Sequence, residues 1–182
     1  MGGKLLKAVK ALQQAFAESN IMGMRTLSNE LIEDAAIEND KMLASVALIG
    51  YSLHKLSTKE HVVEHGKWAI LKRRVLASLE KAANALQRNN LQEFEGTLNG
   101  IIRDIRAIDA QTGNFVQGLY EKAMVKYAAD AYSLGLSLSQ ATELTGAEKD
   151  RVLEYIGATR ISDREVPELG IRERLKKLRK MM

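Results

Sequence analysis

The chain has 182 residues and a formal net charge of +4, and its 46% hydrophobic and 27% charged residues suffice for a packed core beneath a polar surface. Because it contains no cysteine, disulfides, thiol catalysis and zinc sites with cysteine ligands are excluded. Residues 42–53 form the longest apolar run, which is too short to span a bilayer, and the first residues lack the apolar region of a signal peptide. We therefore expect a cytoplasmic protein without a membrane segment.

Apolar residues recur at helical spacing through most of the chain, and strand-forming residues are sparse. The only proline is Pro167, so nothing before it forces a helix to break. Short polar connections favour antiparallel neighbours. The predicted fold class is all-α, an irregular antiparallel helical bundle over residues 1–134. Its helices are expected over residues 4–18, 24–38, 42–56, 59–88, 91–110 and 115–134.

The string HVVEH at residues 61–65 matches the inverted zincin signature. On a helix, His61 and His65 lie one turn apart and could share a zinc ion, with Glu64 as the base. The enzyme class needs a third ligand, and nothing downstream singles one out, so a solvated helix face is the preferred interpretation. Phosphate-binding glycine loops and nucleophile elbows are missing as well. The sequence thus predicts no enzyme, with no catalytic residue, metal site or cofactor.

Residues 138–160, LSQATELTGAEKDRVLEYIGATR, combine two short helical patterns around one glycine. Ser137 and Gln140 have the spacing of a capping box, which predicts that a helix begins there. Gly146 then supplies a turn, where a positive φ is often needed. The segment is therefore expected to form a tight helical corner.

The second helix of this corner is predicted over residues 148–156, with Val152 on its apolar face and Gly157 as its end. Tyr155 and Ile156 complete that apolar face. The corner resembles the helix-turn-helix of DNA-binding proteins. The positions that carry the resemblance are Ala141, Leu144, Gly146 and Val152.

Two features depart from the helix-turn-helix pattern. Ala147 and Glu148 stand where the family usually has a large apolar residue and a Ser or Thr cap. The side chains that would face a DNA groove also include three acids, and DNA favours proteins that neutralise its phosphates. The reading face consists of Glu148, Lys149, Asp150, Arg151 and Glu154.

The chain ends in a basic stretch, GIRERLKKLRK, and EYIGATRISD follows the corner. Together they resemble the endings of small archaeal helix-turn-helix proteins, some of them proposed to be antitoxins paired with PIN-domain nucleases. The resemblance implies two roles, contact with DNA and contact with a nuclease-like partner. The DNA-contacting residues would be Lys149, Arg151, Arg160, Arg164, Arg174, Lys176 and Lys177.

The predicted organisation is a helical bundle (1–134), a helix-turn-helix-like segment (135–163) and a basic amphipathic tail (164–182). The function predicted from it is DNA-linked regulation, of the antitoxin type that the resemblance implies, with a homodimer as one arrangement that would suit a two-fold DNA site. The alternative is a helical protein–protein interaction module with no nucleic-acid or catalytic role.

Overall fold

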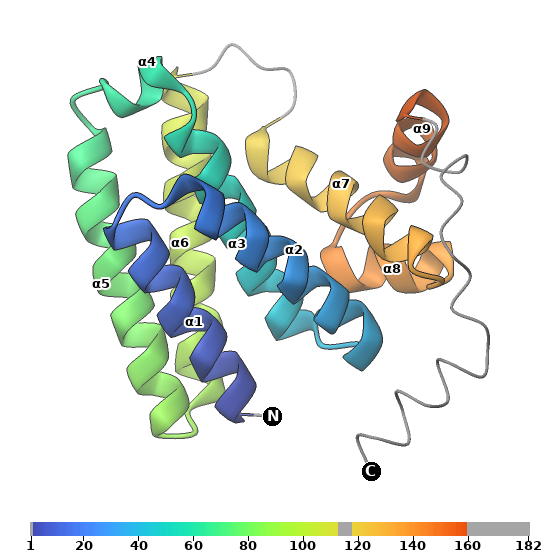
Figure 1. Cartoon of the computed structure of the whole chain (residues 1–182), viewed down its shortest axis with the longest axis horizontal. Coiled ribbons are helices and arrows are strands. Elements are labelled where there is room, and N and C mark those ends of the chain that lie inside the picture. The colour runs from blue at the N-terminus through green and yellow to red at the C-terminus, as the bar shows by residue number, and fades with distance from the viewer. Residues whose placement is uncertain (1, 113–117, 160–182) are drawn as a thin grey trace.

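The computed structural model describes residues 2–112 and 118–159, and within these ranges the chain forms helices and no strand. Figure 1 shows α1, α5 and α6 side by side, α2 and α3 crossing the middle, and α7 to α9 at the other end of the molecule. The all-α fold class is confirmed, and no described helix is long and apolar enough to cross a membrane. The bundle helices are α1 (Gly2–Ala17), α2 (Ile21–Glu38), α3 (Lys41–Ser57), α4 (Glu60–Val63), α5 (Trp68–Gln87) and α6 (Leu91–Thr112).

Tight turns connect the hairpin helices of the bundle. Ser19, Asn39 and Asn89 have φ values of 55°, 52° and 56°, so each turn reverses the chain through one left-handed residue. Asn20 then caps α2 by accepting a hydrogen bond of 2.8 Å from the Gly23 amide. Such short, capped turns make successive helices antiparallel, as expected.

Among the described helices, α2 and α3 make the most extensive contact. Gly50 lies in α3 where a Cβ atom would overlap Ser28 Oγ of α2 and approach Leu12 Cδ1 of α1 to 3.2 Å. Ser28 is fully buried, and its hydroxyl donates to the Met24 carbonyl at 2.7 Å. A glycine at this position lets three helices meet without a void.

The prediction of one helix over residues 59–88 is wrong. The chain forms the short α4, turns at residues 64–67, and starts α5 at Trp68. Tertiary packing explains the break, since Val62 is fully buried and the Trp68 ring meets the Phe16 ring edge-on at 6.1 Å. Ser57 ends α3, and the residue before α4, Lys59, makes no side-chain hydrogen bond that caps this short helix.

The last three helices are α7 (Leu119–Ser133), α8 (Leu138–Thr145) and α9 (Lys149–Thr159). Among the described helices, the backbone of α7 lies close to α2, α3 and α6, whereas that of α9 lies close only to α7 and α8. Asp109 of α6 fixes the start of α7 by accepting from the Leu119 amide at 2.5 Å. The carboxylate of Asp109 also pairs with Lys59 at 3.5 Å. The α8–α9 corner is thus joined to the bundle chiefly through α7.

Candidate nucleic-acid interface

The start and the turn of the corner form as the sequence predicts. Ser137 Oγ accepts from the Gln140 amide at 3.2 Å, and Gln140 Oε1 accepts from the Ser137 amide at 2.9 Å, which completes a capping box. Gly146 has φ 78° and ψ 12°, and its amide donates to the Thr142 carbonyl at 2.8 Å. Gly146 therefore ends α8 in the left-handed conformation that favours glycine.

The second helix is longer than predicted. It begins at Lys149 and continues to Thr159, so Gly157 lies inside α9 and the predicted end at Gly157 is wrong. A glycine within a helix costs only about 1 kcal/mol relative to alanine, too little to end a helix by itself. Beyond Gly157, the Thr159 hydroxyl donates to the Tyr155 carbonyl at 2.7 Å, a contact across the last turn of the helix.

The predicted anchors of the corner are buried. Ala141 and Val152 are fully buried and Leu144 is 4% exposed, and all three belong to the same apolar core as the bundle. Tyr155 and Ile156 are half-buried against this core. Ala147, in the place where a helix-turn-helix carries a large apolar residue, is itself buried. The corner therefore packs against α7 with the small side chain of Ala147 in place of a large apolar one.

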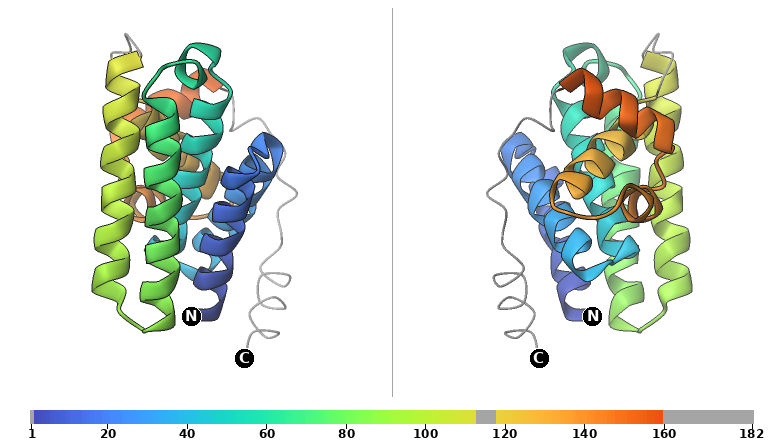
Figure 2. Two further views of the ribbon diagram at one scale, coloured as in Figure 1. Left: turned by 90° about the vertical axis from the view of Figure 1, so that its left-hand side faces the viewer. Right: turned by 90° about the vertical axis from the view of Figure 1, so that its right-hand side faces the viewer.

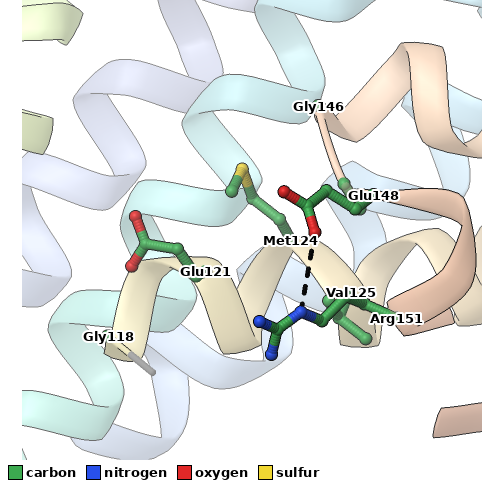
Figure 3. A pocket seen from close by; sticks show the side chains of 8 residues that line it. Gly118, Glu121, Met124, Val125, Gly146, Glu148 and Arg151 are labelled. Carbon is green, nitrogen blue, oxygen red and sulfur yellow. Dashed lines mark ion pairs between the residues drawn. The ribbon is translucent and has the colours of Figure 1, made fainter. Parts of the chain in front are cut away.

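The cations of the predicted reading face point to solvent. Lys149 and Arg151 are both exposed, so the bundle does not occlude them. Arg151 Nε lies 3.6 Å from Glu148 Oε2, a weak ion pair one turn away on the same segment (Figure 3). Arg160, Arg164, Arg174, Lys176 and Lys177 lie outside the described residues.

The carboxylates around these two cations give the corner an acidic surface. Glu148, Asp150 and Glu154 are exposed on or beside α9, and Glu143 of α8 pairs with Lys41 at 2.8 Å. An anionic surface of this kind repels phosphate unless other cations lie nearby. The corner thus has the two helices and the turn that the sequence predicts, whereas its exposed face carries more acids than bases.

A hollow of about 260 Å³ lies beneath the turn, between α7 and the start of α9 (Figure 3). Met124 forms its floor, and its sulfur would lie 3.6 Å from a Cβ atom at Gly146. Glu121 on the rim is held by Arg106 at 2.7 Å. The charged groups that line this hollow, Glu121, Glu148 and Arg151, are thus paired within the protein, which leaves little for a ligand to bind.

The HVVEH string does not place His61 and His65 on one helix face. His61 lies in α4, but α4 ends at Val63, and His65 lies in the following turn, where its Nδ1 accepts from the Lys67 amide at 3.3 Å. His54 is buried on α3 with Nδ1 3.0 Å from the Ile21 carbonyl oxygen, and burial lowers the pKa of its imidazole. No group of three or more His, Asp and Glu side chains that could hold a metal ion occurs within residues 2–112 and 118–159.

Sequence reasoning missed a second group of cations on the bundle side of α9. Tyr51 and Lys55 of α3, Lys122 and Lys126 of α7 and Tyr155 of α9 line one hollow. Tyr51 and Lys55 are four residues apart, as are Lys122 and Lys126, so each pair lies on one helix face. That spacing was the available signal, but only the packing of α3 against α7 brings the pairs together.

Comparisons with protein-family models, with curated proteins and with solved structures gave no match. The class that can be stated for this chain is therefore the one defined by its fold, an all-α helical bundle.

Proposed function

We propose that this protein is a DNA-linked regulator that contacts DNA through the α8–α9 corner. The observation that carries the proposal is the placement of α9, which lies on the outer face of α7 with Val152 as its fully buried residue (Figure 2, right). The rest of α9 is exposed or half-buried. A capped α8, a left-handed turn glycine and an outer second helix are the parts that a helix-turn-helix uses in the major groove.

In this arrangement the N-terminal turn of α9 would enter the groove first. Lys149 and Arg151 would contact phosphates or guanine edges, whereas Asp150 and Glu154 would accept hydrogen bonds from cytosine amino groups. Because these acids also repel phosphates, affinity for unselected DNA from the corner alone would be low. The proposal therefore requires cations beyond the corner, a role that the sequence assigns to Arg160, Arg164 and the basic tail.

Fluorescence anisotropy with labelled duplex DNA at two salt concentrations tests the proposal. Each lysine or arginine paired with a phosphate contributes about −0.9 to the slope of log K against log salt. Lys149→Ala plus Arg151→Ala should weaken binding and reduce the slope by up to about 2. The charge-matched control is Lys7→Ala plus Lys10→Ala, two exposed lysines of α1, a helix that does not contact α8 or α9. Absence of binding at low salt, or equal losses in the two double variants, would contradict groove contact by α9.

A dimer adds a geometric test. Two corners related by two-fold symmetry would need a spacing of about 34 Å to enter successive major grooves. Sedimentation analysis with and without duplex DNA measures whether a dimer forms. A strictly monomeric complex on a palindromic duplex would rule out this arrangement.

The second candidate function is docking of a protein partner. The antitoxin resemblance implies that this partner would be a nuclease. Docking is favoured by Leu153, which is 53% exposed on α9 between the acids Asp150 and Glu154. An apolar residue with an acidic rim suits a basic groove on a partner. Leu153→Ser should abolish such a complex, whereas Ile70→Ser, at a similarly exposed apolar residue of α5, should not. Retention of the partner by Leu153→Ser would eliminate docking through α9.

A further inference from the structure

A hollow of about 400 Å³ opens between α3, α7 and α9, on the bundle side of the corner. Its size falls within the range of about 300–1,000 Å³ that is typical of small-molecule sites. Two helices of the bundle and one helix of the corner contribute to it, so its lining comes from segments far apart in the sequence. The polar lining residues are Tyr51, Lys55, Lys122, Lys126 and Tyr155.

Three lysine side chains line this hollow. Lys55 Nζ and Lys126 Nζ lie 5.5 Å and 5.2 Å from the centroid of the same Tyr51 ring, one from α3 and the other from α7. Lys126 pairs with Asp130 at 2.5 Å, and Lys122 adds a third ammonium group to the lining. No carboxylate belongs to the described lining itself. Cations gathered over a partly apolar hollow concentrate the field there and attract an anion.

The remaining walls are apolar or aromatic. Tyr51 packs against the buried Tyr127 with ring centroids 5.1 Å apart, which holds the Tyr51 ring in place. Tyr155 supplies the ring on the α9 side, and Leu119 and Val125 complete the apolar surface. A hydrated inorganic ion would leave these walls unused. A ligand with a flat ring beside its negative group would cover them and contact the ammonium groups at the same time.

We propose that this hollow is a binding site for a small aromatic anion, a single ring system that carries a phosphate or a carboxylate group. The ring lies between Tyr51 and Tyr155, and the anionic group contacts Lys55 and Lys122. The site does not depend on DNA binding by α9, because its cations lie on α3 and α7. A ligand bound there would, however, contact both the bundle and, through Tyr155, helix α9 of the corner.

Isothermal titration of the full chain with phenyl phosphate tests the site, with benzoate, inorganic phosphate and phenol as the other arms. Phenyl phosphate or benzoate should bind at least about tenfold more tightly than both inorganic phosphate and phenol, because only they use the cations and the rings together. Which of the two binds more tightly identifies the anionic group. Binding of inorganic phosphate or phenol as tight as that of the better ring anion, or no binding of either ring anion at millimolar concentration, would overturn the proposal.

Variants place the binding in this hollow. Lys55→Gln plus Lys122→Gln should weaken the preferred ring anion by about tenfold or more, since charge-assisted hydrogen bonds are lost. The charge-matched control is Lys7→Gln plus Lys10→Gln, which should bind as the wild type does. Tyr155→Ala should weaken binding, and Tyr155→Phe should retain it. Wild-type affinity in the Lys55 and Lys122 variant would refute the site, whatever the outcome of the DNA titrations.

Discussion

Two glycines of the corner should respond in opposite ways to the same substitution. At Gly146, alanine must adopt φ 78°, a left-handed conformation that costs an L-residue about 1–2 kcal/mol. Space is not the obstacle, because the nearest atom to the added Cβ would be Met124 Sδ at 3.6 Å. Alanine also restricts the unfolded chain, which returns about 0.4–1 kcal/mol. Gly146→Ala should therefore destabilise the protein by about 1 kcal/mol.

Gly157 is the matched comparison within the same corner. It lies in the helical interior of α9, and nothing lies within 4 Å of a Cβ added there. Gly157→Ala should then stabilise the protein by about 0.5–1 kcal/mol, the usual gain when alanine replaces glycine within a helix.

Thermal unfolding followed by far-ultraviolet circular dichroism measures both effects. For a chain of this size about 1 kcal/mol corresponds to about 2–4 °C in Tm. Gly146→Ala should lower Tm by about that amount, and Gly157→Ala should raise it by about 1–4 °C. The opposite order, with Gly157→Ala the more damaging variant, would mean that the second helix ends at Gly157 and that the assignment of α9 is incorrect.

Three further predictions concern the bundle. Gly50→Ala should lower the urea midpoint, because overpacking against Ser28 costs about 1–3 kcal/mol and exceeds the helical gain of alanine; an unchanged midpoint would mean that the crossing is loose. Asp109→Ala should cost about 1.5–3 kcal/mol in urea unfolding by removing the acceptor of the Leu119 amide, and a loss below about 0.5 kcal/mol would show that this bond is dispensable. Burial lowers the pKa of His54 in the folded state, so the unfolded state binds more protons below the ordinary value of 6.5 and stability should fall as the pH drops through that value. His54→Gln should flatten this pH dependence, and an unaltered profile would assign it to other groups.

The helical class and most helix positions could be predicted from hydrophobic spacing alone. The break between α4 and α5 was missed, although residues 64–67 hold a glycine and no large apolar side chain, because one glycine does not by itself end a helix and the contact of Trp68 with Phe16 is not local in the sequence. Gly146 and Gly157 both follow apolar helical segments, and sequence alone does not say which one is left-handed. Local spacing thus predicts elements, whereas long-range packing decides where they end.

The two candidate sites also differ in whether their residues are neighbours in the sequence. The corner is local, so its cap, its turn glycine and its buried anchors could be located from about twenty neighbouring residues. The cationic hollow is not local, since Lys55 and Lys122 are brought together only by the packing of α3 against α7. No pattern in the sequence predicts which helices become neighbours, and the hollow was therefore missed.

The narrow attachment of α9 has a consequence for the dynamics of the protein. Because the backbone of α9 lies close only to α7 and α8 among the described helices, we expect α9 to open locally while the core of α1, α2, α3, α5 and α6 stays folded. Opening of this kind costs less free energy than global unfolding, so the amides of α9 should exchange with solvent faster than those of α3. A ligand that binds α9 only while it is packed on α7 and α8 stabilises this packed state. Such binding should slow amide exchange in α9.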